Sequence, residues 1–380
     1  MRHRLTTSAV TLVLGAGLLT GCSGDDESGS DGTTSAAPSS PSGAESSSPP
    51  SATEAPVARA RVAGVVATGL EAPWDIAFLP DGTALVSERD SDRLLRVTAS
   101  GEVSTVGSVR GVDGNGEGGL LGLAVSPSYD QDQTVFVYFT AGSENVVARM
   151  TYDGQRVSGQ RTVFDGIPAG PIHNGGRIAF GPDGFLFVGT GEAGRRDPSQ
   201  DPDDLGGKIL RITPDGDAAP GNPAGSPVWS LGHRNVQGLG WDERGRMWAS
   251  EFGQNTWDEL NRIVPDGNYG WPEVEGRAGD DDFRDPARQW HTDVASPSGI
   301  AVAGGSVFMA GLRGERLWQI PLLDQGTGTP QALLSGRYGR LRAVVAAPDG
   351  SLWVLTNNTD GRGSPRDGDD RIIRLELSTS

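Results

Sequence analysis

Short runs in which apolar and small or polar residues alternate recur along most of this chain, and each follows a turn of the Pro-Asp-Gly type. Examples are AFLPDGTALVSER at 77–89, AFGPDGFLFVGTG at 179–191 and AAPDGSLWVLTN at 346–357. Such alternation predicts β-strands with one buried face. Six of these turns begin near residues 79, 126, 181, 242, 303 and 348, so the unit repeats at intervals of roughly 45 to 60 residues.

This repeat predicts the fold class. A unit of that length made only of strands is typical of a propeller blade, and the chain shows no convincing amphipathic helix of ordinary length. Six units in about 320 residues give about 53 residues for each blade, which is enough for four short strands and their loops. We therefore expect residues 61–380 to be all-β and to form a six-bladed β-propeller with four-stranded antiparallel blades. A β-sandwich or a barrel is the alternative fold.

The first residues of the chain have a different pattern. Arg2 and Arg4 precede an apolar stretch that is too short to span a bilayer and has the form of a secretory signal. The stretch ends in LLTGCSG, which resembles the bacterial lipoprotein box, and Cys22 is the only cysteine in the sequence. We therefore expect residues 1–21 to be a lipoprotein signal peptide and Cys22 to be lipidated. An ordinary signal peptide followed by a chance cysteine is the alternative.

Composition and charge extend this picture. Residues 22–60 are nearly all Ser, Gly, Pro, Ala, Thr and acidic residues, which cannot bury enough apolar surface to become ordered, so we expect a disordered linker. With the lipid, this predicts an exported protein that is attached to the outer face of the cell membrane through its anchor alone. The formal net charge of -17 makes nucleic acid an improbable partner and suits divalent cations.

The loops that interrupt the repeat contain the candidate chemistry. PIHNGGR at 171–177 supplies a candidate base, and LGHRN at 231–235 and GRYGRLR at 336–342 supply guanidiniums. The segment 249–272 is rich in carboxylates, amides and turn carbonyls, which suit Ca²⁺ with its about six to eight oxygen ligands. Zinc is unsupported because no two histidines have ligand-like spacing, and the sequence has no nucleophile elbow or phosphate-binding loop.

Four phrases give a resemblance to a known family. They are IHNGGR at 172–177, GKILRI at 207–212, LGHRNVQGL at 231–239 and NYGWP at 268–272. Together they resemble the soluble pyrroloquinoline quinone (PQQ)-dependent glucose dehydrogenases and the related aldose or sorbosone dehydrogenases, over about residues 62–377. The resemblance implies a six-bladed propeller, in agreement with the repeat. It also implies an enzyme that oxidises the anomeric hydroxyl of an aldose to a lactone with PQQ and bound Ca²⁺, and that passes electrons to an acceptor the sequence does not identify.

The resemblance also implies roles for single residues. His173 matches the catalytic histidine that takes the proton of the sugar hydroxyl, a task for which imidazole has a suitable pKa. Arg234 and Asn235 match the pair that contacts the cofactor, where a guanidinium can polarise the quinone oxygen and assist catalysis. The other implied positions are Arg313, Arg340 and Arg342 for the cofactor, Glu117 for the substrate, Gly253 and Gln254 for the cofactor-associated calcium, and Asp258, Glu259 and Tyr269 for a structural calcium.

Three neighbours of this predicted site depart from the family pattern. Phe252 stands where a Gln or His normally reaches the cofactor, Glu117 replaces a Gln, and Ile172 replaces an Asp beside the catalytic histidine. Phe252 and Ile172 favour a non-catalytic surface propeller that binds carbohydrate or protein. A calcium-dependent hydrolase of the lactonase kind is a further alternative, although it would leave Arg340 and Arg342 with no tricarboxylate to bind.

Overall fold

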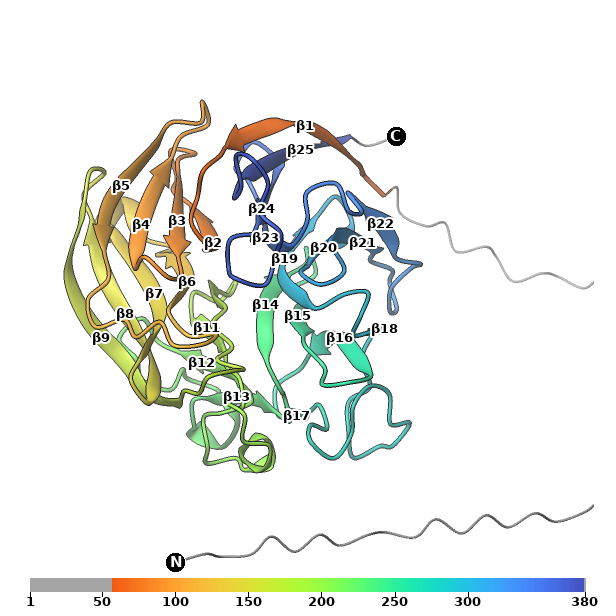
Figure 1. Ribbon diagram of the computed structural model, residues 1–380. Coiled ribbons are helices and arrows are strands. Elements are labelled where there is room, and N and C mark those ends of the chain that lie inside the picture. The colour runs from red at the N-terminus through yellow and green to blue at the C-terminus, as the bar shows by residue number, and fades with distance from the viewer. Residues whose placement is uncertain (1–56, 379–380) are drawn as a thin grey trace, which may run out of the picture. The chain divides into compact units, whose positions relative to one another are not determined.

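The computed structural model describes residues 57–378, in which almost all of the regular secondary structure is strand. These strands form six sheets arranged around a centre (Figure 1). Within a sheet, consecutive strands mostly pair antiparallel, because each apolar run is joined to the next by a short turn. The predicted six-bladed propeller is confirmed. The predicted signal peptide, Cys22 and most of the predicted linker lie outside the described residues.

We number the blades from the first innermost strand. Blades 1 and 2 consist of β2 (Pro73–Phe78), β3 (Ala84–Glu88), β4 (Arg93–Val97) and β5 (Val103–Ser108), and of β6 (Leu120–Val125), β7 (Thr134–Ala141), β8 (Glu144–Tyr152) and β9 (Val157–Pro168). Blades 3 and 4 consist of β10 (Ile178–Phe180), β11 (Leu186–Gly189), β12 (Lys208–Ile212), β13 (Val228–Leu231) and β17 (Gly267–Asn268), and of β14 (Val236–Trp241), β15 (Met247–Glu251), β16 (Trp257–Ile263) and β18 (Arg288–His291). Blades 5 and 6 consist of β19 (Pro297–Ala303), β20 (Ser306–Gly311), β21 (Arg316–Pro321) and β22 (Gln331–Leu333), and of β23 (Leu341–Ala346), β24 (Leu352–Thr356), β25 (Ile372–Ser378) and β1 (Arg59–Ala67). In the described part of the chain, the helical elements are three short turns, α1 (Tyr129–Asp132), η1 (Asp197–Gln200) and η2 (Pro223–Gly225). No helix within residues 57–378 is long and apolar enough to cross a membrane.

The ring closes in blade 6, where the start of the described chain meets its end. β1 pairs antiparallel with β25 as the outermost strand, from Arg59 opposite Ser378 to Ala67 opposite Ile372 (Figure 1, orange beside blue). Strands from both ends of the described chain therefore complete one blade, which ties the first and last segments of the ring together. β1 begins at Arg59, just before the predicted boundary of the linker.

Blade 3 departs from the predicted four strands. β17 pairs parallel with β13, with Gly267 opposite Ser230 and Asn268 opposite Leu231. The chain between β16 and β18 leaves blade 4 and crosses to blade 3, where the Tyr269 N–H donates to the Leu231 carbonyl at 2.9 Å. This crossing brings the predicted NYGWP phrase beside the LGHRN phrase.

Apolar side chains fill the spaces between neighbouring blades, and polar side chains occupy part of the centre. Trp74, Leu121 and Ile178, from three successive blades, are buried in one cluster. The innermost strands approach so closely that a Cβ on Gly122 would overlap the carbonyl oxygen of Gly176. The scaffold around the axis is therefore tightly packed, which suits a site built on its ends.

Candidate active site

One end of the propeller axis opens into a cavity of about 280 Å³. It lies where the innermost strands begin, and residues from all parts of the ring line it. Six of them are arginines: Arg89, Arg234, Arg313, Arg340, Arg342 and Arg362. The structure thus gathers most of the predicted site residues here: Glu117, His173, Arg234, Asn235, Gly253, Arg313, Arg340 and Arg342. Their chemical roles stay predictions.

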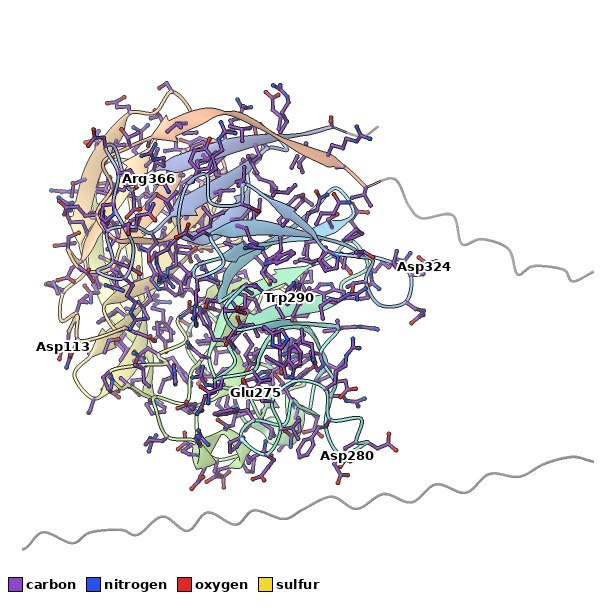
Figure 2. All side chains as sticks on the ribbon, turned by 45° about the vertical axis from the view of Figure 1, so that its right-hand side comes forward. Asp113, Glu275, Asp280, Trp290, Asp324 and Arg366 are labelled. Carbon is purple, nitrogen blue, oxygen red and sulfur yellow. The ribbon has the colours of Figure 1, made fainter. Side chains whose placement is uncertain are left out.

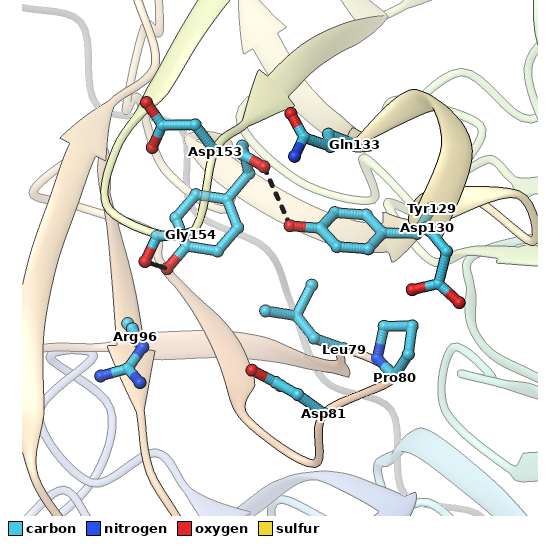
Figure 3. Close-up of a pocket in the computed structure, with 10 residues that line it drawn as sticks. Leu79, Pro80, Asp81, Arg96, Tyr129, Asp130, Gln133, Asp153 and Gly154 are labelled. Carbon is cyan, nitrogen blue, oxygen red and sulfur yellow. Dashed lines mark hydrogen bonds between the residues drawn. The ribbon is translucent and has the colours of Figure 1, made fainter.

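A second hollow, of about 250 Å³, lies at the other end of the sheets (Figure 3). Leu79 to Asp81 line it from the β2–β3 turn, which is at the far end of β2 from the arginine-lined cavity. Its two tyrosine hydroxyls are already used: Tyr129 donates to the Tyr152 carbonyl at 2.9 Å, and Tyr152 donates to the Gly154 carbonyl at 2.9 Å. None of the predicted site residues lines this hollow.

The imidazole of His173 is held from both sides. Its Nδ1 lies 2.6 Å from Oε1 of Glu192, and its Nε2 lies 2.9 Å from Nη2 of Arg234. A guanidinium can only donate, so Nε2 accepts and Nδ1 carries the proton that goes to Glu192. The side chain is 14% exposed and borders the cavity. His173 therefore presents an unprotonated Nε2 to the cavity, which is the state that a general base requires.

The backbone around His173 is unusual. His173 has a φ of 58°, in the left-handed region that side chains other than glycine rarely adopt. Its carbonyl accepts the N–H of Ala193 at 3.0 Å, and a Cβ on Gly191 would overlap that carbonyl. The glycines around this loop therefore allow the chain after β11 to lie directly against the histidine.

Glu192 is a site residue that the sequence analysis missed. Its side chain is 2% exposed, and its Oε2 has no hydrogen-bond partner within the described chain. A buried carboxylate on imidazole Nδ1 fixes the tautomer and stabilises the imidazolium that forms when Nε2 takes a proton. The only signal in the sequence was an acidic residue directly after a strongly apolar strand, in GTGE at 189–192.

Arg234 and Asn235 form hydrogen bonds with buried groups. The backbone N–H of Arg234 donates to Oε1 of Glu251, and Oε2 of Glu251 lies 2.8 Å from Nδ1 of His233. Oδ1 of Asn235 accepts the Gly175 N–H at 2.9 Å, which ties this segment to the loop of His173. His233 is fully buried and also contacts Ser230, so its role is to hold this loop in place.

Arg340 and Arg342 lie side by side on the first residues of blade 6. Asp360 Oδ2 lies 3.1 Å from Arg340 Nη2 and 3.8 Å from Arg342 Nη2. Arg342 also donates to Gln237 at 2.8 Å and to Asn357 at 3.0 Å. Burial lowers the pKa of Arg342, and the single charge of Asp360 offsets this only in part.

One predicted residue, Arg313, and one of the departures from the family pattern, Phe252, line the cavity. Arg313 is exposed at the edge of the cavity. Phe252 lines the cavity, and its carbonyl accepts a hydrogen bond from Nη1 of Arg234 at 3.2 Å. Ile172 is 38% exposed, and its aliphatic side chain has no atom that could hydrogen-bond to the histidine. Glu192, from a different loop, occupies the supporting position instead.

The predicted calcium ligands fall into two places. Gly253 borders the arginine-lined cavity, and neither its carbonyl nor that of Gln254 accepts a hydrogen bond from residues 57–378. Free carbonyls of this kind are suitable calcium ligands. Asp258 binds the two loops beside them, because its carboxylate accepts the N–H of Gly253 at 2.9 Å and of Ser296 at 2.6 Å.

The other two predicted ligands face away from Asp258. Glu259 and Tyr269 border a very small cavity together with Glu251. Burial and the charge of Glu251 raise the pKa of Glu259, and Asn261 Nδ2 donates to both carboxylates. No cluster of three or more His, Cys, Asp or Glu side chains placed to hold a metal occurs among residues 57–378. A cation near Glu251 and Glu259 would therefore rely on amide and carbonyl oxygens as well.

A buried lysine braces the loop that follows Glu192. Lys208 is the only lysine in the sequence and is fully buried. Its Nζ donates to the carbonyls of Pro198 and Gly206, each at 2.7 Å, and to that of Ser199 at 3.2 Å. Burial lowers the pKa of Lys208 to about 8. The GKILRI phrase thus contributes an internal cation that closes the chain between β11 and β12.

Acidic side chains lie in two kinds of surroundings. Asp280 and Asp324 extend from the body of the domain, whereas Glu275 lies among the loops (Figure 2). Glu275 Oε1 accepts four consecutive N–H groups, from Gln254 to Trp257, at 2.7 to 3.1 Å. Its charge thereby shapes the turn that presents the free carbonyls of Gly253 and Gln254.

Comparison with known proteins gives consistent matches. The family model described as glucose / sorbosone dehydrogenase matches residues 70–373. The structure of the PQQ-bound form of aldose sugar dehydrogenase from Streptomyces coelicolor is 57% identical, with a TM-score of 0.83, over 86% of this chain and 100% of that one. Aldose sugar dehydrogenase YliI from Escherichia coli is 28% identical over 78% of this chain and 91% of its own length. Quinoprotein glucose dehydrogenase B from Acinetobacter calcoaceticus is 30% identical over 63% of this chain and 59% of its own length.

Proposed function

The chain belongs to the glucose / sorbosone dehydrogenase family, and from that premise we propose that it oxidises the anomeric hydroxyl of an aldose to the lactone, with PQQ as cofactor and His173 as general base. The observation that carries the proposal is the environment of His173. Its Nε2 faces an arginine-lined cavity, while a buried carboxylate holds Nδ1. A positioned base beside a cluster of anion-binding groups is what proton removal from a sugar next to an anionic cofactor requires.

The residues of the cavity fit PQQ, a flat tricarboxylate. Six guanidiniums border the cavity, and Nε of Arg234 and of Arg340 are buried without a hydrogen-bond partner in the described chain. The lowered pKa of Arg342 reflects a buried cation with too little negative charge around it. Carboxylates of the cofactor would supply that charge through bidentate contacts. Arg313, Arg340 and Arg342 would hold them, and Arg234 with Asn235 would contact the quinone.

The protein's own groups then act on the sugar hydroxyl. When bound, PQQ supplies the acceptor for the hydride, and so for the two electrons, of the oxidation. A sugar hydroxyl that reaches Nε2 of His173 replaces Nη2 of Arg234 as the partner of that nitrogen. The proton of the hydroxyl then passes to Nε2. Glu192 stabilises the resulting imidazolium through Nδ1. Glu117 is the carboxylate that lines the cavity, where it can accept hydrogen bonds from other hydroxyls of the sugar.

Calcium is part of the proposal. Gly253 borders the same cavity and Gln254 follows it in the chain, so a Ca²⁺ ion held by their carbonyls would contact both the protein and an anionic ligand. Glu259 and Tyr269, with Glu251, would hold a second ion in the small neighbouring cavity. Asp258 supports the first site through the Gly253 N–H rather than through a shared cluster with Glu259.

We further propose that the enzyme is exported and attached by lipid on Cys22 to the outer face of the cell membrane. The support for this is the lipoprotein-like LLTGCSG sequence and the single cysteine. Metabolic labelling with a radioactive fatty acid tests it: the wild-type chain is expected to incorporate label, and Cys22→Ala is expected to incorporate none. Equal labelling of both chains would contradict the anchor.

One assay tests the activity. Purified protein is incubated with Ca²⁺, PQQ, an aldose and an artificial electron acceptor dye, and dye reduction is followed. We expect reduction that depends on PQQ and falls at least about 100-fold in His173→Gln. Absence of PQQ binding in an absorbance titration would overturn the proposal. Lactone hydrolysis without PQQ would favour the lactonase alternative, and neither activity would favour a binding propeller.

A further inference from the structure

Arg362 lies at the mouth of the site but belongs to none of the predicted contacts. It is on the loop between β24 and β25 of blade 6, and its side chain is 52% exposed. Its Nη1 lies 2.6 Å from Oε1 of Glu117, which precedes β6 of blade 2. The ion pair therefore joins two loops that are 245 residues apart in the sequence.

The carboxylate of Glu117 bridges Arg362 and the backbone of His173. Its Oε2 accepts the His173 N–H at 2.9 Å, and its own N–H donates to the Pro171 carbonyl at 3.0 Å. Burial opposes the charge of this carboxyl, but the His173 N–H and Arg362 outweigh it and lower the pKa of Glu117. Glu117 thus stays ionised at neutral pH and holds the segment 171–173 at two points.

The left-handed backbone of His173 makes such a restraint important. A non-glycine residue at a φ of 58° is strained, and it keeps that conformation only when its neighbours hold it there. The restraint on the N–H side of His173 is Glu117, and on the carbonyl side it is the Ala193 N–H. A shift of this backbone would move Nε2 relative to the cavity.

The other end of Arg362 leads to the arginines proposed for the cofactor. The backbone N–H of Arg362 donates to Oδ1 of Asp360 at 2.9 Å, and Oδ2 of Asp360 lies 3.1 Å from Nη2 of Arg340. Contacts therefore run without a break from Arg340 through Asp360 to the backbone of Arg362, and from the guanidinium of Arg362 to Glu117. The last link is the hydrogen bond from Glu117 to the backbone of His173.

We propose that Arg362 is a positioning residue that holds the backbone of His173 through Glu117 and couples it, through Asp360, to the Arg340 side of the cofactor pocket. The inference rests on the proposed function only in that His173 is taken as the base. Arg362 contacts neither the imidazole nor a reacting atom, so its effect is on geometry. A base displaced by a fraction of an ångström reacts more slowly without binding substrate less tightly.

The test compares Arg362→Gln and Arg362→Lys with Arg366→Gln. Arg366 is on the same loop (Figure 2) and contacts the Arg337 carbonyl at 2.9 Å, not Glu117. With PQQ and Ca²⁺ bound, Arg362→Gln is expected to lower kcat about tenfold with little change in KM. Arg362→Lys should restore most of kcat because it keeps the charge, and Arg366→Gln should behave as the wild type.

A second readout does not depend on activity. Hydrogen–deuterium exchange followed by mass spectrometry on a peptide that contains 171–176, without PQQ, should be faster in Arg362→Gln than in the wild type. Adding Arg362→Gln to Glu117→Gln should cause no further loss of kcat, because both changes break one chain of contacts. Unchanged exchange in Arg362→Gln, or an equal loss of kcat in Arg366→Gln, would overturn the inference. If the wild type has no dehydrogenase activity, the proposed function fails, and the exchange measurement alone decides the role of Arg362.

Discussion

Nη2 of Arg234 lies 2.9 Å from Nε2 of His173, opposite the contact between Nδ1 and Glu192. The arginine and the carboxylate together define one tautomer of the imidazole, with its basic nitrogen towards the cavity. They come from the loop before β14 and the loop after β11, which meet because Gly191 and Asn235 form a β-bridge. The base is therefore set up by contacts between blades and not by its own loop alone.

Replacement of Glu192 by Gln should impair catalysis more than binding. The amide can still accept the Nδ1 proton, but it loses the negative charge that stabilises the imidazolium. We expect kcat to fall about 100-fold with a similar KM for the aldose. Steady-state kinetics of the PQQ-loaded enzyme measures this, with Glu376→Gln, an exposed surface carboxylate, as control. A wild-type kcat in Glu192→Gln would show that the carboxylate does not support His173.

Replacement of Arg342 by Gln should weaken PQQ binding. The side chain is only 7% exposed, and a cofactor carboxylate would become one of its few counter-charges. Loss of such a buried charge pair should raise the Kd for PQQ about 30-fold or more. An absorbance titration of the protein with PQQ gives the Kd, and Arg61→Gln, at the exposed outer strand, should leave it unchanged. Equal Kd values for the wild type and Arg342→Gln would place the cofactor elsewhere.

Calcium should stabilise the fold, and more so as pH rises. Glu251 and Glu259 are both buried, and the raised pKa of Glu259 shows that the pair resists a second negative charge. Below that pKa protons compete with Ca²⁺, so the effect of the ion should grow from pH 5.5 to pH 8. At Ca²⁺ well above its Kd, Tm at pH 8 should exceed that in EGTA by about 5 °C.

Thermal unfolding of Glu259→Gln serves as the matched control for this effect. The amide removes the like-charge repulsion, so the variant should be more stable than the wild type in EGTA and should respond less to Ca²⁺. Identical melting curves of the wild type in Ca²⁺ and in EGTA would contradict a calcium site in this domain.

Lys208 should titrate far below an ordinary lysine. Burial lowers its folded-state pKa to about 8, whereas the unfolded chain retains the ordinary value of 10.5. The unfolded state therefore binds more protons between these values, so the stability contributed by this group is fully present above about pH 10.5 and is lost as pH falls through about 8. Lysine labelled with ¹³C at Cε gives a single NMR signal from this chain, which should shift with a midpoint near pH 8. A midpoint near 10.5 would show that the ammonium is solvated.

The blade count was predictable because its signal is local. A Pro-Asp-Gly turn followed by an alternating run is written into consecutive residues, and the same arrangement recurs six times. β17 could not be predicted in the same way. Its two residues join blade 3 only because the chain between β16 and β18 crosses to β13, which depends on packing between distant segments.

The same distinction separates the site residues that were predicted from those that were missed. His173, Arg234, Arg340 and Arg342 stand in phrases that resemble a known family, and the structure gathers them in one cavity. Glu192 and Arg362 were missed because each acts on a residue far away in sequence. The acidic and arginine-rich loop around Arg362 has the composition of a solvated turn, and only the fold brings it to Glu117.

The burial of Lys208 has a chemical consequence for a protein that meets reducing sugars. The open-chain aldehyde of an aldose condenses with free amines to give Schiff bases, and lactones acylate the same groups. The sequence contains one lysine, and its Nζ is enclosed by three carbonyls, while every other basic side chain at the surface is an arginine or a histidine. Guanidiniums stay protonated and do not react in this way. The surface of the folded domain is thus free of the side-chain amines that sugars and lactones would otherwise modify.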